Sequence, residues 1–135
     1  KGCNHKLKEA IELTAGNTGL TLILALNYSG RWEIMQAAKA LAQKVEKGQI
    51  TSDEVDLTTW ENLLTTRNIP DPALLIRTSG EMRISNFLLW QIAYTELYIT
   101  PVLWPDFRRK HLYEAILAYQ QRERRFGKIS EQVKS

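Results

Sequence analysis

Apolar residues follow two patterns that alternate along the chain, one with helical spacing and one of short continuous runs. Helical spacing appears over residues 5–14, 31–47 and about 107–125, and each of these segments carries an apolar stripe on one face. Between them, residues 20–26 and 73–76 are almost continuously apolar, as is typical of strands buried on both faces of a parallel sheet. This alternation predicts an α/β fold in which a parallel sheet is flanked by helices.

Further segments complete this prediction. Thr58-Thr59-Trp60-Glu61 fits a capping box and predicts a short helix with Leu63 and Leu64 on its buried side. Residues 85–94 are apolar and long enough for another helix, and residues 96–100 predict a third strand. Three strands are few for a complete parallel α/β domain, so the pattern predicts part of a larger fold.

Composition narrows the class of protein. The chain has 135 residues, which suit one compact domain, and its 44% hydrophobic and 24% charged residues are typical of a globular protein. No apolar run approaches the ~18 residues of a membrane-spanning helix, and no targeting signal is visible. Cys3 is the only cysteine, which excludes an internal disulfide and leaves too few ligands for a zinc site with His5 and His111. The net charge of +3 is too small to indicate a nucleic-acid partner.

The densest group of polar side chains spans residues 77–86, which we call the arginine loop. It directly follows a predicted strand, and ligands of open parallel sheets bind beyond the carboxyl ends of strands. Arg77 and Arg83 supply planar donors suited to phosphate. Gly80 can adopt backbone angles that let amide groups converge on an anion, and Ser85 would stand at a helix N-terminus, which favours phosphate. The loop therefore predicts a phosphorylated ligand.

Each of these residues also has a plainer interpretation. Ser85 can serve as a helix cap, and Gly80 can simply make a turn. Arg77 and Arg83 can be paired with Glu81 on a solvated surface. Residue types and spacing alone therefore go no further than a phosphorylated ligand.

A family resemblance takes the prediction further. Essentially the whole chain from Leu7 onward resembles the cis-prenyltransferases, whose members include undecaprenyl and dehydrodolichyl diphosphate synthases. Five segments carry the match: RTSGEMRISNFLLWQ at 77–91, IAYTELY at 92–98, LWPDF at 103–107, ALNYSGR at 25–31 and RERRFG at 122–127. The resemblance implies a transferase that condenses isopentenyl diphosphate with an allylic diphosphate in the cis configuration to make a polyprenyl diphosphate.

The resemblance also implies roles for individual residues at the acceptor substrate. Arg77, Arg83 and Ser85 would bind the diphosphate of isopentenyl diphosphate. Glu96 would help to place a Mg²⁺ ion on that diphosphate, which agrees with the preference of magnesium for carboxylates together with phosphate oxygens. Glu81 would orient one of the arginines and would not bind the metal itself.

Partners and location follow from the same resemblance. Arg125 and Gly127 would reach the active site of a second subunit in a homodimer or heterodimer and bind diphosphate there. Peripheral association with a membrane would let the product leave. The implied location is the cytoplasm or the plastid stroma.

One signature block of the family has no counterpart in this sequence. That block contains an aspartate within Asp-Gly-Asn-Gly-Arg-Trp, and Ser29-Gly30-Arg31-Trp32, its nearest imitation, lacks the aspartate. We therefore expect residues 1–135 to form the C-terminal portion of one cis-prenyltransferase domain, to hold no catalytic residue and to be inactive alone.

Two alternatives remain open at this stage. The chain can be a non-catalytic dimerisation partner, or a truncated product, that contributes only the isopentenyl diphosphate half-site. It can also be a basic nucleic-acid-binding domain that uses residues 108–110 and 122–125, although no recognised motif supports that reading.

Overall fold

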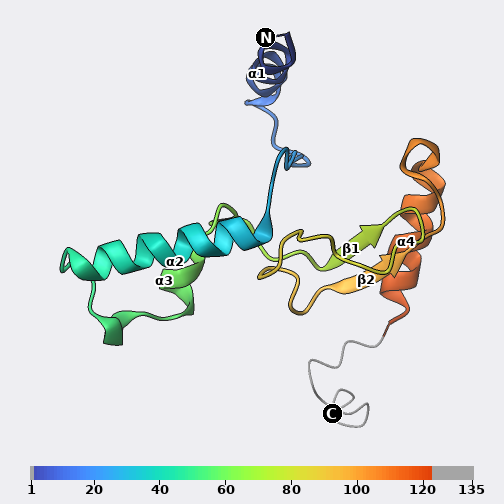
Figure 1. Ribbon diagram of the computed structural model, residues 1–135. Coiled ribbons are helices and arrows are strands. Elements are labelled where there is room, and N and C mark those ends of the chain that lie inside the picture. The colour runs from blue at the N-terminus through green and yellow to red at the C-terminus, as the bar shows by residue number, and fades with distance from the viewer. Residues whose placement is uncertain (1, 123–135) are drawn as a thin grey trace.

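The computed structural model describes residues 2–122. Figure 1 shows an open arrangement, in which α2 and α3 lie on one side, the two strands and α4 lie on the other, and α1 stands apart at the end of an extended link. The described elements are α1 (Gly2–Thr14), α2 (Gly30–Glu46), the 3-10 helix η1 (Ser52–Glu54), α3 (Leu57–Glu61), β1 (Leu74–Arg77), β2 (Glu96–Ile99), the 3-10 helix η2 (Trp104–Asp106) and α4 (Arg109–Gln120).

Strands β1 and β2 form a parallel pair. Leu74 pairs with Glu96 at one end and Arg77 pairs with Ile99 at the other. Helix α4 packs on β2, and the long connection between the strands crosses to the start of α2. The predicted parallel sheet with flanking helices is therefore confirmed, as are the strands predicted near residues 73–76 and 96–100.

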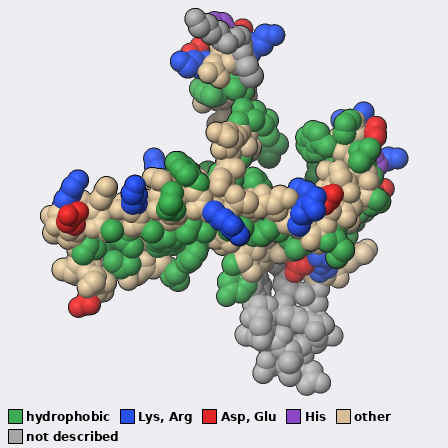
Figure 2. Space-filling model, in the orientation of Figure 1, with side chains coloured by type: hydrophobic (Ala, Val, Ile, Leu, Met, Phe, Trp, Pro, Cys, Tyr) green, Lys and Arg blue, Asp and Glu red, His purple; other side chains and the backbone are tan. Residues whose placement is uncertain are grey.

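Helix α2 begins where the sequence predicts it. The Ser29 side chain accepts a hydrogen bond from the Trp32 amide, which caps the first turn. Few of the apolar side chains that the sequence predicts to be buried are buried in this structure. Among the described residues, the buried apolar side chains are Ala37, Leu64 and Ala115. Figure 2 shows apolar side chains gathered along the surface of α2, so much of its apolar face is open to solvent.

Residues 20–26, which we call the apolar run, were predicted to be a buried strand, and that prediction is wrong for this structure. They are extended but pair with no strand of the described chain. All seven are exposed, with Leu20 at 96% and Leu22 at 77%. A strand needs hydrogen-bonding neighbours, and the described part of the chain supplies none at this position.

The helix predicted over residues 85–94 is also absent from the structure, which shows turns there. Ser85, Asn86 and Leu88 have φ angles of 49°, 61° and 46°. These angles lie in the left-handed region, which a right-handed helix of L-residues does not use. The segment instead folds back onto the start of α2.

The predicted capping box at Thr58 is replaced by a cap two residues earlier. Asp56 accepts a hydrogen bond from the Thr59 amide at 2.7 Å and from the Thr59 hydroxyl at 2.7 Å, so α3 begins at Leu57. Leu64 is buried as expected. Among the described helices, none combines the length and the apolar character that crossing a membrane requires.

Candidate functional site

The arginine loop follows the carboxyl end of β1, and its first residues are hydrogen-bonded to the segment that directly follows β2. The Ser79 amide donates to the Val102 carbonyl at 2.9 Å, and the Gly80 amide donates to the Thr100 carbonyl at 2.9 Å. Ser79 and Gly80 both have φ of 67°, so this turn requires the left-handed region. These two amides are therefore already bonded, and the predicted convergence of amides on an anion at Gly80 is not what the turn provides.

Arg77 is the last residue of β1 and is half-buried. Its Nε is fully buried and has no hydrogen-bond partner within the described chain. An unsatisfied buried donor costs about 1–3 kcal/mol, and more when the group is charged. A positive donor held without an acceptor at the carboxyl end of a parallel strand suits an anionic ligand.

Arg83 lies on the outer part of the loop. Its guanidinium pairs with the Glu81 carboxylate at 2.6 Å, and the Arg83 side chain is 69% exposed. Such a surface ion pair contributes about 0–1 kcal/mol, so a stronger anion can displace it. Glu81 thus pairs with Arg83, an arrangement that fits the plainer interpretation of a solvated ion pair as well as the predicted orienting role, which stays a prediction.

Ser85 is exposed and lies on a turn. With no helix starting there, the predicted support of a helix N-terminus for phosphate is lost. What remains of that prediction is the Ser85 hydroxyl, two residues after Arg83 on the same loop.

Asn86 fastens the loop to the start of α2. Its carbonyl accepts from the Gly30 amide at 2.8 Å, and its Oδ1 accepts from the Arg31 amide at 2.9 Å. Its Nδ2 donates to the Ser29 hydroxyl at 2.8 Å. A Cβ on Gly30 would lie 2.8 Å from Leu89 Cγ and 3.0 Å from the Asn86 carbonyl, so the close approach requires glycine.

Behind this contact, Glu33 is a buried carboxylate at 2% exposure. Its Oε2 accepts from the Tyr28 hydroxyl at 2.5 Å and from Gln91 Nε2 at 3.1 Å. Its Oε1 accepts from the Thr65 amide at 2.9 Å and from the Thr65 hydroxyl. One side chain therefore ties three separate segments together behind the arginine loop.

These contacts set the protonation of the group. Burial by itself raises the pKa of Glu33, but the hydrogen bonds from Thr65, Tyr28 and Gln91 outweigh it and hold the pKa below its ordinary value. Burial raises the pKa of Tyr28, and the bond to the Glu33 carboxylate raises it further. The Glu33–Tyr28 pair is thus a carboxylate bonded to a neutral phenol.

The sequence prediction did not include Asn86 or Glu33 among the functional residues. A signal was present, because Glu33 directly follows the segment ALNYSGRW, which carries part of the family resemblance. Apart from Tyr28, which lies five residues before Glu33, their partners are 32 to 58 residues away along the chain, and pattern analysis of single segments does not connect them.

Glu96 lies at the opposite end of the sheet from the arginine loop. It pairs with Leu74, three residues before Arg77, which is about 10 Å along a strand. Its carboxylate is bonded to Arg122 at 2.8 Å, and Arg122 also donates to the Leu97 carbonyl. This chain therefore does not bring Glu96 to Arg77, Arg83 and Ser85, and across residues 2–122 no three acidic, histidine or cysteine side chains form a metal cluster.

The remaining predicted positions give little support to a nucleic-acid site. Arg125 and Gly127 lie outside the described residues. Arg108 donates to the carbonyls of Pro105 and Phe107, and Arg122 is paired with Glu96. Two of the described members of the predicted basic cluster, Arg108 and Arg122, therefore hold the chain's own backbone and a carboxylate.

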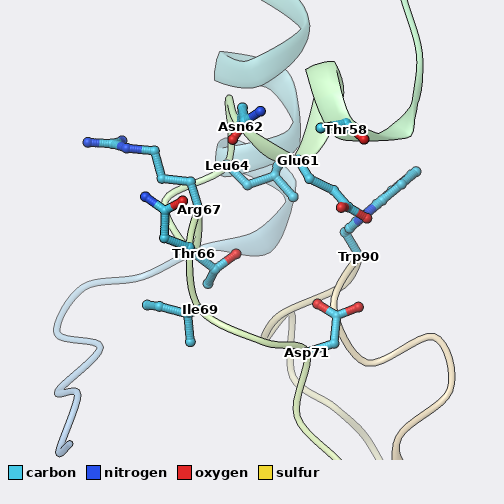
Figure 3. Close-up of a pocket in the computed structure, with 10 residues that line it drawn as sticks. Thr58, Glu61, Asn62, Leu64, Thr66, Arg67, Ile69, Asp71 and Trp90 are labelled. Carbon is cyan, nitrogen blue, oxygen red and sulfur yellow. The ribbon is translucent and has the colours of Figure 1, made fainter.

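Among the hollows that the described residues line, two border the segments described above. Figure 3 shows a small one of about 120 Å³ beside α3, with Glu61, Trp90 and Asp71 along one side and Asn62, Arg67 and Ile69 along the other. A larger apolar groove of about 530 Å³ lies against the apolar run, and its lining includes Ile23, Leu24, Trp32, Ile69, Phe87 and Leu88.

Comparison with known proteins places the chain among prenyltransferases. The prenyltransferase family model described as undecaprenyl diphosphate synthase matches residues 1–127. The chain is 56% identical over 127 residues to ditrans,polycis-undecaprenyl-diphosphate synthase of Pasteurella multocida, covering 94% of this chain and 53% of that protein. It is 54% identical to isoprenyl transferase of Chlorobaculum tepidum, covering 96% and 49%. The solved structure of lavandulyl diphosphate synthase from Lavandula x intermedia, in complex with dimethylallyl diphosphate, superimposes with a TM-score of 0.86 at 43% identity, covering 93% of this chain and 54% of that one.

Proposed function

Because the chain belongs to the undecaprenyl diphosphate synthase family of prenyltransferases, we propose that it supplies the isopentenyl diphosphate half of a cis-prenyltransferase active site. The chain spans about half the length of the curated relatives it matches. The observation that carries the proposal is the buried, unpartnered Nε of Arg77 at the carboxyl end of β1. The overall reaction is the condensation of isopentenyl diphosphate with an allylic diphosphate to extend a polyprenyl diphosphate.

Three residues of the arginine loop each contribute a different contact to the diphosphate. Arg77 donates from a fixed, half-buried position and so orients the diphosphate, because a charged donor in a partly dry site binds more strongly than one in water. Arg83 exchanges its exposed pairing with Glu81 for a phosphate oxygen. Ser85 donates its hydroxyl to the same group. With the diphosphate held, the double bond of the isopentenyl chain is positioned for attack on the allylic carbon.

The proposal includes a Mg²⁺ ion, which Glu96 would help to bind. One carboxylate suits Mg²⁺, because this ion fills most of its shell with phosphate oxygens and water. Glu96 would first have to release Arg122, to which it is bonded at 2.8 Å. Glu96 would also have to cover the roughly 10 Å along the sheet that separates it from Arg77, so in this structure it does not reach a diphosphate held by the arginine loop, and the role of Glu96 with Mg²⁺ stays a prediction.

Assembly and location are further parts of the proposal. Arg125 and Gly127 would bind diphosphate in the site of a second subunit, in a homodimer or a heterodimer. The product would leave through peripheral contact with a membrane, from the cytoplasm or the plastid stroma. The block with the catalytic aspartate is supplied by another part of the domain or by a partner.

Calorimetric titration with isopentenyl diphosphate, with and without Mg²⁺, tests the proposal. We expect saturable binding by the chain, and Arg77→Ala should weaken it about 10- to 100-fold, which is the loss of one charged hydrogen bond. Arg83→Ala should weaken it about tenfold. Arg109→Ala is the matched control, since it removes the same charge from the exposed first residue of α4.

Two results would contradict the proposal. One is no saturable heat from a chain whose circular dichroism shows its helices intact. The other is binding that falls equally in the Arg77→Ala and Arg109→Ala variants, because this would mean a diffuse electrostatic effect and no defined site.

A further inference from the structure

The middle of the arginine loop is a short span that is fixed at both ends. At one end, the amides of residues 79–80 donate to carbonyls that directly follow β2. At the other end, Asn86 is bonded to the start of α2 (Figure 1). Within the described chain, residues 81–85 form hydrogen bonds and ion pairs only with residues at most three positions away. The positions of Arg83 and Ser85 therefore depend on the two fixed ends.

Asn86 makes the second fixed end, and we call its three hydrogen bonds to the start of α2 the Asn86 anchor. Its carbonyl accepts from the Gly30 amide at 2.8 Å, and its Oδ1 accepts from the Arg31 amide at 2.9 Å. Its Nδ2 donates to the Ser29 hydroxyl at 2.8 Å. The first amides of a helix have no partner within the helix, and Asn86 satisfies two of them. An amide side chain suits this place because it both accepts and donates.

The backbone beside the anchor is strained. Ser85 and Asn86 have φ angles of 49° and 61°. Residues other than glycine adopt this left-handed region at a cost, although asparagine tolerates it better than most. Such a conformation persists only where the surrounding structure enforces it, and it is common at ligand sites. Along the chain, the bonds nearest to Ser85 that reach another element are those of Asn86, so the anchor holds Ser85 in this conformation.

We propose that Asn86 is a positioning residue of the diphosphate site, whose anchor on α2 holds Ser85 and Arg83 where the diphosphate binds. Asn86 acts through these neighbours, because its carbonyl, Oδ1 and Nδ2 are each already bonded at the start of α2. Arg77 lies on β1, before the first fixed end, so its position does not depend on the anchor. The inference rests on the proposed function and adds the residue that shapes that site.

Calorimetric titration of the full chain with isopentenyl diphosphate measures the effect of the anchor. Asn86→Gly removes both side-chain bonds and keeps the left-handed backbone accessible. We expect it to weaken binding about tenfold, because Ser85 and Arg83 are no longer held in place. Thr59→Val is the control: it has nearly the same shape, loses the hydroxyl bond to Asp56 at 2.7 Å on α3, and should change the affinity by less than about twofold.

Combined substitutions separate a positioning role from a general loss of stability. Ser85→Ala should weaken binding by the native chain but should change the affinity of Asn86→Gly by less than about twofold, because the hydroxyl is already out of place. Arg77→Ala should weaken binding by the same factor in the native chain and in Asn86→Gly, because β1 holds Arg77 in both.

A measurement on the native chain decides the case in which circular dichroism shows that Asn86→Gly does not fold. By thermodynamic linkage, a contact that strengthens binding of a ligand is itself stabilised by that ligand to the same extent. Saturating isopentenyl diphosphate should therefore slow deuterium exchange of the Gly30 and Arg31 amides about tenfold. The Thr59 amide, which is bonded to Asp56, should exchange at an unchanged rate.

Several results would overturn the inference and leave the proposed function standing, as long as Arg77→Ala still weakens binding. These are native affinity in Asn86→Gly, an equal loss in Thr59→Val, and a full effect of Ser85→Ala in the Asn86→Gly chain. Unchanged exchange of the two α2 amides at saturation would have the same meaning. No saturable binding by the native chain, or native affinity in Arg77→Ala, would overturn the proposed function and this inference with it.

Discussion

Replacement of Glu33 by glutamine tests the network behind the arginine loop, because the change nearly conserves volume while it removes the charge and replaces one acceptor oxygen with an NH₂ donor. The carboxylate accepts from the Tyr28 hydroxyl, the Gln91 side chain, and the amide and hydroxyl of Thr65. Glutamine has one carbonyl oxygen and one NH₂ group, so at least one of these donors would face another donor. Hydrogen bonds to a charged group contribute about 1.5–3 kcal/mol, and we expect a net loss of about 2–4 kcal/mol.

Hydrogen exchange at the Thr65 amide measures this loss locally. This amide donates to Glu33 Oε1 at 2.9 Å, so its exchange reports the opening of the network. A loss of about 2 kcal/mol speeds exchange about 30-fold at 25 °C. Glu61→Gln is the control, because Glu61 is an exposed carboxylate on α3, and it should change the rate by less than about threefold.

The network also predicts a dependence on pH. The pKa of Glu33 is held below its ordinary value of 4.5 in the folded chain. The stabilisation is therefore complete above the unfolded pKa and is lost as the pH falls through the folded pKa. The protection factor of the Thr65 amide, which is its exchange rate relative to an unfolded chain at the same pH, should therefore fall below about pH 4.5 in the native chain but not in Glu33→Gln. An unchanged Thr65 rate in Glu33→Gln, or the same acid response in both proteins, would refute the role of the carboxylate.

The remaining predictions concern the contacts that shape the loop. Asn86→Ala should lower the free energy of unfolding, measured by urea denaturation, by about 1–3 kcal/mol through two lost side-chain hydrogen bonds, and by a further amount because its φ is 61°. Asn86→Gly should lose the hydrogen bonds without the backbone strain, so equal losses in the two variants would argue against the strain. Gly30→Ala should cost more than about 1 kcal/mol because its Cβ would lie 2.8 Å from Leu89 Cγ, and a neutral effect in the same assay would contradict this packing. Gly80→Ala should cost about 1–2 kcal/mol from backbone strain alone, since the nearest atom to its Cβ would be Pro101 Cα at 3.8 Å, and a loss larger than about 3 kcal/mol would indicate a clash that the structure does not show.

The parts of the fold that the sequence predicted correctly are those that local patterns determine. Helix α2 and the strand that ends at Arg77 both follow from spacing and residue type within a few positions. The parallel arrangement of the strands follows from their alternation with helices.

The errors occurred where distant residues decide the local structure. The apolar run has the composition of a strand, but strand formation depends on a neighbour that the described chain does not place beside it. Residues 85–94 have the composition of a helix, but the bonds of Asn86 to Ser29, Gly30 and Arg31 hold the backbone in turns.

The candidate site shows the same division. The clustering of Arg77, Arg83 and Ser85 was visible in the sequence because all three lie within nine positions of one another. The unpartnered Nε of Arg77 was not visible, since it depends on packing around the end of β1. Neither was the pairing of Glu96 with Arg122, which lies 26 residues away.

The most direct measurement of the central claim is the NMR signal of the Arg77 Nε–H group during titration with isopentenyl diphosphate, assigned by its absence in Arg77→Lys. If the arginine loop binds the diphosphate, this buried donor gains its missing acceptor, and its signal should shift and saturate with the affinity found by calorimetry. The Nε–H signal of exposed Arg109 should not move. Saturable binding that leaves the Arg77 signal unchanged would place the diphosphate elsewhere and contradict the account.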